Sequence, residues 1–206
     1  MSLVLINCSK SKAINPFKLP EILQGNINVP SDDIDKEDHY RSKLSQYLTS
    51  AEQLYKGPEF TAYKLLAKRY GSQLLILSAR YGLIKGSREI LPYDATLAGK
   101  GRDYIEKAVN KWIIYGNYDA EMLRMKWRCA VIRLSRNYLL SLRLLGERLA
   151  FNPCTVGERT IIIGSRSELN LLDDECLKIG VKGNGEARKV ASLIDINECS
   201  LQSPPS

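Results

Sequence analysis

Short apolar runs alternate along the chain with longer stretches in which apolar residues recur every three or four positions. The short runs cover residues 2–7, 73–78, 129–135 and 159–164. Apolar runs of this length, bounded by polar residues, are typical of buried strands. Helical spacing is found over residues 41–56, 58–70, 101–115, 118–127, 137–151 and 185–194. Because parallel strands need crossover connections, the alternation predicts an α/β fold with three layers: a mostly parallel sheet of about four to five strands with helices on both faces.

The length of 206 residues fits one domain, which we place at residues 1–199. Residues 13–40 are rich in proline, asparagine and aspartate and contain Pro16, Pro20 and Pro30, so we predict a loop insertion there. Residues 200–206 include Pro204 and Pro205 and are predicted to form a flexible tail.

No apolar run approaches the ~20 residues that a membrane-spanning helix needs, so no membrane association is expected. The chain enters a strand-like run at Ser2 without a basic leader, which favours a cytoplasmic protein. His39 is the only histidine, and the cysteines form no C-x-x-C pair, so we predict reduced thiols, no metal site and no cofactor. The cysteines are Cys8, Cys129, Cys154, Cys176 and Cys199.

The chain carries 30 Lys+Arg and 23 Asp+Glu, a net charge of +7, and the basic excess is concentrated between Gly99 and Arg148. A positive face attracts polyanions and supports contacts with phosphate groups. DNA or RNA is therefore the expected partner. The alternative is an ordinary solvated helix surface.

The first candidate motif follows the first predicted strand directly. Hydroxyl groups, backbone amides and two lysines in a tight loop can hold a phosphate, although the spacing is not that of a Walker loop. Cys8 is a candidate nucleophile, but no histidine base follows it in the motif, and a small buried core cysteine is the alternative. A polar turn with solvated lysines is equally compatible. The predicted site residues of this loop are Asn7, Cys8, Ser9, Lys10 and Lys12.

The second candidate motif follows the second predicted strand and contains Ser78, Arg80, Tyr81 and Gly82. Gly82 permits a sharp turn, and Arg80 can pair with a phosphate.

Tyr93 and Asp94 lie eleven and twelve positions after Gly82 and complete the motif. Two tyrosines can stack on a base, and Asp94 can orient water or accept a proton. The structural alternative is that both tyrosines pack in the core and Asp94 caps a turn. We predict Asp94, Arg80 and Cys8 as catalytic residues.

Gly183 and Gly185 precede or open the last predicted helix and are predicted to contact the substrate. Glycines at that position let the backbone approach a ligand and direct the helix N-terminal amides at an anion. A plain helix start is the alternative.

Several segments together resemble a little-characterised family of bacterial, archaeal and phage domains, itself similar to the YaaA peroxide-stress proteins. The matching segments are N-C-S-K-S-K at 7–12, A-x-x-L-Y-x-G-x-x-F at 51–60, L-S-A-R-Y-G-L-I at 77–84, P-Y-D-A-T-L at 92–97 and the terminal G-x-G helix. YaaA-type proteins are associated with DNA binding and stress protection, and the smaller relatives look like base-excision and base-exchange folds. The chain departs from the YaaA pattern at Cys8-Ser9-Lys10, at Asp94 and in the acidic stretch before Arg41.

The motifs and the resemblance favour a nucleic-acid-associated protein that recognises or processes a nucleobase, with N-glycosidase or base-exchange activity as the enzymatic form. In that hypothesis Ser9, Lys10 and Lys12 hold phosphate, while Tyr81 and Tyr93 flank the base. Two alternatives stay open: a non-catalytic YaaA-like DNA-binding protein of the stress response, and an enzyme acting on small nucleotides or nucleosides.

Overall fold

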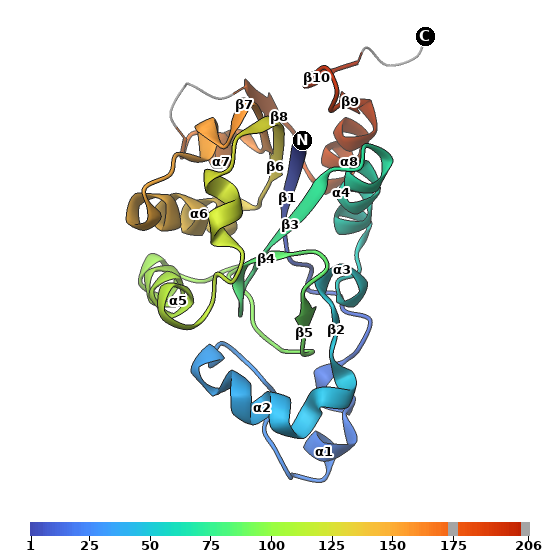
Figure 1. The fold of residues 1–206 in the computed structure, drawn as a ribbon, viewed down its shortest axis with the longest axis vertical. Coiled ribbons are helices and arrows are strands. Elements are labelled where there is room, and N and C mark those ends of the chain that lie inside the picture. Colours follow the sequence, from blue (N-terminus) through green and yellow to red (C-terminus); the bar gives the residue numbers. More distant parts are fainter. Residues whose placement is uncertain (173–176, 203–206) are drawn as a thin grey trace.

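The computed structural model describes residues 1–172 and 177–202, which form an α/β fold around a six-stranded sheet (Figure 1). The strand order is β4-β3-β1-β6-β7-β8, and β4 alone runs antiparallel to its neighbour. The predicted α/β class and mostly parallel sheet are confirmed. The strands are β1 (Ser2–Asn7), β3 (Gln73–Ser78), β4 (Gly82–Lys85), β6 (Trp127–Arg133), β7 (Gly157–Gly164) and β8 (Leu177–Gly180).

The sheet has six strands rather than the predicted four to five. The two additional strands, β4 and β8, have four residues each and lie at the two edges of the sheet. β4 lies in residues 79–100, between the predicted strand at 73–78 and the predicted helix at 101–115, where Gly82 turns the chain back onto β3 with a φ of 67°. Edge strands this short carry too few residues for an apolar pattern to be distinctive.

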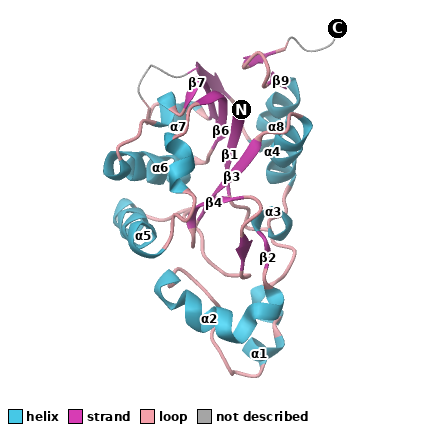
Figure 2. Cartoon of the chain, in the orientation of Figure 1, coloured by secondary structure: helices cyan, strands magenta, loops and turns pink. Residues whose placement is uncertain are grey.

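Helices cover both faces of the sheet (Figures 1 and 2). The helices α4 (Pro58–Arg69) and α8 (Asn184–Leu193) pack together on one face. The other face carries α5 (Arg102–Tyr115), α6 (Arg136–Leu149) and the short α7 (Arg166–Leu169). Each long helix turns an apolar stripe toward the sheet, as Leu139, Leu142 and Leu145 do in α6. The three predicted layers are therefore present.

Two predicted helices are wrong. Residues 41–56 are divided among the end of α2 (Glu37–Leu44), a 3-10 turn (Ser45–Tyr47), β2 (Thr49–Ser50) and α3 (Ala51–Leu54). The break occurs because Thr49 and Ser50 pair with β5 (Glu89–Ile90). Residues 118–127 hold only the 3-10 helix Ala120–Arg124 before β6 begins at Trp127.

The predicted loop insertion at residues 13–40 is part of a small structured lobe, which we call the insertion lobe and define as residues 13–48. It contains α1 (Pro20–Leu23), α2 and three 3-10 turns (Pro16–Lys18, Ile34–Lys36 and Ser45–Tyr47) and lies beyond the carboxyl ends of the strands (Figure 2). A second small core of Leu19, Tyr40 and Leu44 with Leu91 holds it together. Ile14, Ile22, Ile27, Tyr47 and Leu48 pack around this core.

The C-terminal segment is joined to the sheet by a disulfide between Cys129 and Cys199, whose Cα atoms are 5.5 Å apart. The prediction of reduced thiols is therefore wrong for this pair, because 70 residues separate the two cysteines and spacing alone does not reveal their contact. Cys8 is the free thiol among the described cysteines, and Cys176 lies outside the described residues. In the predicted tail, β10 (Ser200–Leu201) pairs with β9 (Ile194–Asp195), whereas residues 203–206 lie outside the described part.

A search of residues 1–172 and 177–202 found no helix with the length and apolarity required to cross a bilayer.

β1, in the middle of the sheet, is the point where the order of strand addition switches from one side of the sheet to the other. From β1 the chain proceeds to β3 on one side and later returns to β6 on the other side. In open α/β sheets, the loops leave such a point in opposite directions and open a crevice at the carboxyl ends of the strands, where ligands commonly bind. The fold therefore marks the carboxyl ends of β1 and β6 as the place to look for a site.

Candidate functional site

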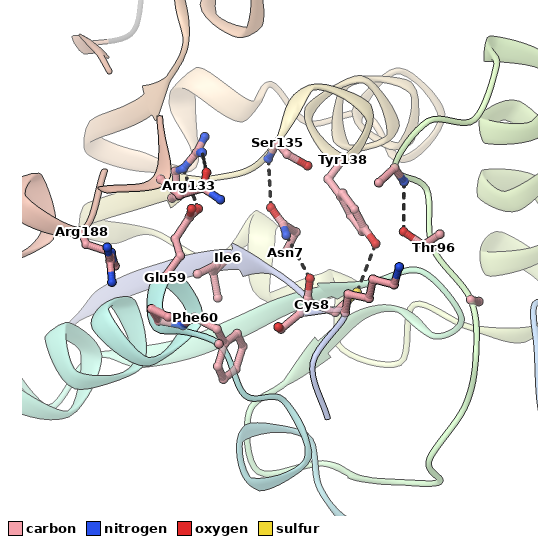
Figure 3. Close-up of a pocket in the computed structure, with 17 residues that line it drawn as sticks. Ile6, Asn7, Cys8, Glu59, Phe60, Thr96, Arg133, Ser135, Tyr138 and Arg188 are labelled. Atoms are coloured by element: carbon pink, nitrogen blue, oxygen red, sulfur yellow. Dashed lines mark hydrogen bonds and ion pairs between the residues drawn. The ribbon is translucent and has the colours of Figure 1, made fainter. Parts of the chain in front are cut away.

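A cavity of about 470 Å³ opens at the carboxyl ends of β1 and β6 (Figure 3). We call it the β1–β6 cleft. Its lining residues come from the loop after β1, the start of α4, the segment 95–98, the end of β6 with the start of α6, and the start of α8. They are Ile6, Asn7, Cys8, Ser9, Lys10, Gly57, Pro58, Glu59, Phe60, Ala95, Thr96, Ala98, Arg133, Ser135, Tyr138, Asn184 and Arg188. Four residues predicted from the first motif, Asn7 to Lys10, are among them.

Hydrogen bonds hold the loop after β1 between the start of α4 and the start of α6. Asn7 accepts a hydrogen bond from the Ser135 backbone N–H at 2.9 Å and donates to the Cys8 carbonyl at 3.0 Å. Ser9 donates its hydroxyl hydrogen bond to the Lys56 carbonyl and accepts one from the Ser11 N–H. These contacts connect β1 to the starts of both α4 and α6.

Gly57 allows this close approach. Its φ of 144° lies in the region that favours glycine, and a Cβ there would lie 2.7 Å from the Ser9 Oγ. In the sequence, Gly57 separates the predicted helices at 41–56 and 58–70 and belongs to the motif at 51–60. Its contact with Ser9 depends on tertiary packing, which no local pattern reveals.

Three helices begin at the cleft, at Pro58, Arg136 and Asn184, with Gly57, Ser135 and Gly183 as their N-caps. None of the three caps uses its side chain to bond the first turn. Free N–H groups and the helix dipole make such ends favourable for anions. The three helix starts lie at one cavity, although at α6 the Arg136 N–H already donates to the Glu168 carboxylate at 3.1 Å.

Two exposed cations also line this cavity. Lys10 and Arg188 line the cleft, and in the described part of the chain neither forms an ion pair. An anion that enters the cleft therefore meets charges that no carboxylate already neutralises.

Arg133, at the end of β6, is buried in the wall of the cleft and bonded to two carboxylates. Its Nε lies 2.8 Å from Glu59 and its Nη1 3.1 Å from Glu168. A third contact, at 3.4 Å, reaches the Asn184 side chain. Arg133 thus connects the starts of α4 and α8 with α7 and fixes the geometry of the cleft.

Cys8 lies deep in the cleft, with 6% of its surface exposed, and its Sγ is 3.2 Å from the Tyr138 hydroxyl. Burial and the neighbouring Cys8 raise the pKa of Tyr138, so this hydroxyl stays protonated and can donate to the sulfur. Of the three predicted catalytic residues, Cys8 is the one that lines the cleft.

Lys12 does not line the cleft but lies behind it, with its ammonium 4.6 Å from the centre of the Tyr93 ring. Burial lowers the pKa of Lys12, while nearby Cys8 and Asp94 act to raise it. Its predicted role as a phosphate ligand therefore has no support from its position.

The second motif lies at the same edge of the sheet as the first, since the Cys8 N–H donates to the Leu77 carbonyl at 2.9 Å. Its side chains, however, point into the core. Arg80, Tyr81 and Tyr93 are each 0% exposed. We correct the prediction that the two tyrosines flank a base and that Arg80 acts on substrate, because fully buried groups cannot reach a ligand.

Arg80 instead holds the insertion lobe. Its guanidinium lies 2.8 Å from Asp33 and 3.0 Å from Glu37, and it donates to the Ser31 carbonyl. Tyr81 donates to Glu37 at 3.2 Å. The acidic stretch of the lobe therefore supplies partners for a buried arginine on the main domain.

Ser78 and Tyr93 belong to a buried cluster of hydroxyl groups. The Tyr93 hydroxyl lies 2.8 Å from that of Tyr55 and 2.9 Å from that of Ser78. Ser78 also accepts from the Arg80 and Tyr81 backbone N–H groups, which shapes the turn after β3. These roles are structural, so the prediction of Ser78 as a substrate ligand is wrong.

Asp94 is exposed but does not line the cleft, and its N–H donates to the Pro30 carbonyl of the lobe at 2.8 Å. Gly82 has the expected turn conformation, and a Cβ there would lie 2.2 Å from the Asn117 side chain, which leaves no room for substrate. Gly183 and Gly185 flank the start of α8 beside the cleft without lining it. None of these four residues contacts the cavity.

The lobe contact predicts acid sensitivity. Although burial acts to raise the pKa of Asp33, hydrogen bonds from Tyr40, Ser31 and Arg80 lower it to about 2, from 3.8. A carboxyl group with a lowered pKa in the folded state stabilises that state above its unfolded pKa and loses this contribution as the pH falls. We expect the free energy of unfolding to decline between pH 4 and 2, measured by urea denaturation, and Asp33→Asn to flatten that decline.

The control for this measurement is Asp38→Asn. Asp38 is an exposed carboxylate of the same lobe without an ion pair in the described residues. An equal flattening by Asp38→Asn would show that the acid sensitivity does not come from the contact with Arg80.

Comparison with known proteins found a family model that matches part of the chain. No curated protein matches the chain. The resemblance to YaaA-type proteins is not addressed by these comparisons and stays a prediction. Residues 40–141, from α2 to the first half of α6, match the model of a family described as a family of unknown function (DUF6884).

Proposed function

We propose that the β1–β6 cleft binds a nucleotide unit, with its phosphate at the starts of α4, α6 and α8, and that the protein recognises or processes the attached nucleobase. One observation carries the proposal: three helix N-termini and the unpaired cations Lys10 and Arg188 meet in one cavity, at the point where the strand order switches sides. Phosphate binding at helix N-termini of α/β sheets has this physical basis.

The remainder of the cleft suits the uncharged part of a nucleotide. Its volume of about 470 Å³ is within the ~300–1,000 Å³ typical of small-molecule sites. Phe60 and Tyr138 are the aromatic residues of its lining, and they replace Tyr81 and Tyr93 as the groups available to a base. Thr96, Ser135 and the Tyr138 hydroxyl can hydrogen-bond a sugar or a base edge.

Two forms of this function follow from Cys8. If the protein is an N-glycosidase or base-exchange enzyme, Cys8 is the predicted catalytic residue that the cleft still offers, because Arg80 and Asp94 lie elsewhere. If Cys8 serves only to pack against Tyr138, the same cleft is a non-catalytic site for nucleotide recognition in DNA or RNA. Base release by the parent protein and its loss in Cys8→Ser would support the enzyme.

Nucleotide binding can be tested directly by isothermal titration calorimetry with the four ribonucleoside monophosphates and the corresponding nucleosides. We expect at least one nucleotide to bind more tightly than its nucleoside. Arg188→Gln and Lys10→Gln should each lower the affinity for that nucleotide at least about tenfold, since a hydrogen bond to a charged group contributes ~1.5–3 kcal/mol.

The matched control is Lys68→Gln, which removes an exposed positive charge at the opposite end of α4. Its nucleotide affinity should equal that of the parent. Equal affinity for nucleotide and nucleoside, or unchanged affinity in Arg188→Gln, would contradict the proposal.

A further inference from the structure

Exposed basic residues follow the carboxyl end of four neighbouring strands, β1, β6, β7 and β8. Lys10 and Arg136 each lie three residues after their strand, while Arg166 and Lys182 each lie two residues after theirs. We call these four residues and Arg188, which lies in the first turns of α8, the carboxyl-edge cations. Their order along the edge is set by the strand order, so they form a row rather than a cluster.

No carboxylate in residues 1–172 or 177–202 neutralises this row by an ion pair. Among the acidic residues beside it, Glu59 and Glu168 are already bound to Arg133. The Glu186 carboxylate accepts a hydrogen bond from the Lys182 backbone N–H at 2.6 Å, which ties it to the backbone just before α8.

The basic stretch that the sequence emphasised behaves differently. Within residues 99–148, Arg102 pairs with Glu106, Lys111 with Asp32, and Arg143 with Glu147. Those charges are partly neutralised on the outer helices. Along the edge of the sheet, by contrast, none of the five carboxyl-edge cations forms an ion pair within the described residues.

The row extends beyond the cleft. Lys10 and Arg188 line the cavity, whereas Arg136, Arg166 and Lys182 do not. Neighbouring strands lie about 4.8 Å apart, so the edge from β1 to β8 spans about 14 Å. A single nucleotide held in the cleft leaves most of this row unused, whereas a longer polyanion can use all of it.

We propose that a single-stranded nucleic acid lies along the carboxyl edge, with its backbone on the carboxyl-edge cations and one of its nucleotides in the β1–β6 cleft. This inference rests on the proposed function and extends it to a substrate class. A single strand fits because the inner end of the cleft is formed by the buried residues Ile6, Cys8 and Tyr138, which a base can reach only when it is unpaired and unstacked.

The test compares oligonucleotide and mononucleotide binding in the double variant Arg166→Gln/Lys182→Gln, whose two sites lie outside the cleft. Fluorescence anisotropy with short labelled single strands of mixed DNA and RNA sequence should show an affinity lower by on the order of tenfold near 0.1 M salt. The slope of log affinity against log salt should become shallower by about 1.4, or about 0.7 for each lost phosphate contact. Mononucleotide affinity, measured by calorimetry, should stay at the parent value.

The control double variant is Lys107→Gln/Arg148→Gln, which removes the same charge from exposed positions on α5 and α6. It should bind single strands as the parent does. Equal weakening by both double variants would overturn the proposed track, as would parent-like binding by Arg166→Gln/Lys182→Gln or tighter binding of the matching duplex. If the parent protein bound single strands but no mononucleotide, the proposed function would be contradicted while the track stayed in place.

Discussion

Arg80→Met is expected to lower the free energy of unfolding by about 3–5 kcal/mol, the usual effect of removing one partner from a buried ion pair. Arg80 is 0% exposed and contacts two carboxylates, Asp33 and Glu37. Methionine fills much of the same volume, so the loss comes from two carboxylates deprived of their buried partner rather than from a cavity. Urea denaturation followed by circular dichroism measures the change.

The matched control is Arg41→Met. Arg41 also contacts Glu37, at 2.8 Å, but its side chain is 36% exposed. Exposed pairs contribute roughly 0–1 kcal/mol, so the control should remain close to the parent. Limited proteolysis adds a local readout, since Arg80→Met should expose the insertion lobe to cleavage first. Equal stability of the two variants would show that the lobe is held by its apolar core instead.

Arg133→Met is expected to lower the stability by a similar ~3–5 kcal/mol and also to impair nucleotide binding. Without Arg133, the Glu59 carboxylate is left uncompensated in the cleft and repels an incoming phosphate. Glu168 loses its partner as well, although it still accepts from the Arg136 N–H. The double variant Arg133→Met/Glu59→Gln should recover part of both losses, because the two residues are in contact.

Arg143→Met serves as the control for this pair. Arg143 contacts Glu147 at 3.2 Å, and both side chains are more than half exposed. Its removal should change the stability by less than about 1 kcal/mol and leave nucleotide affinity unaltered. If Arg133→Met bound nucleotide as tightly as the parent, the buried network would have no part in the site.

Periodicity alone predicted much of the scaffold. The strands at Ser2–Asn7 and Gln73–Ser78 match the prediction to the residue, and α4, α5, α6 and α8 match to within two residues at each end. These elements are long or strongly apolar, and their pattern reflects one buried face. The prediction of an α-helix over residues 118–127 is wrong because the buried residues Met122 and Leu123 belong to a 3-10 helix of five residues, whose apolar pattern also fits a short α-helix.

The candidate site was predictable in one half only. The loop from Asn7 to Lys10 could be found because it follows a recognisable strand, and Ser135 and Tyr138 follow β6 by the same rule. Side-chain orientation could not be found in this way. Arg80 turns inward because it pairs with Asp33 and Glu37. Since these partners lie more than 40 positions earlier, the pairing leaves no local trace in the sequence.

The central position of β1 has a consequence for the segment that matches the family model. Residues 40–141 include β3 and β6, which do not touch each other because β1 lies between them. Expressed alone, that segment would have to leave two strand edges without hydrogen-bonding partners. The first seven residues therefore complete the domain: they provide the shared inner strand and, through the loop that follows, one wall of the cavity.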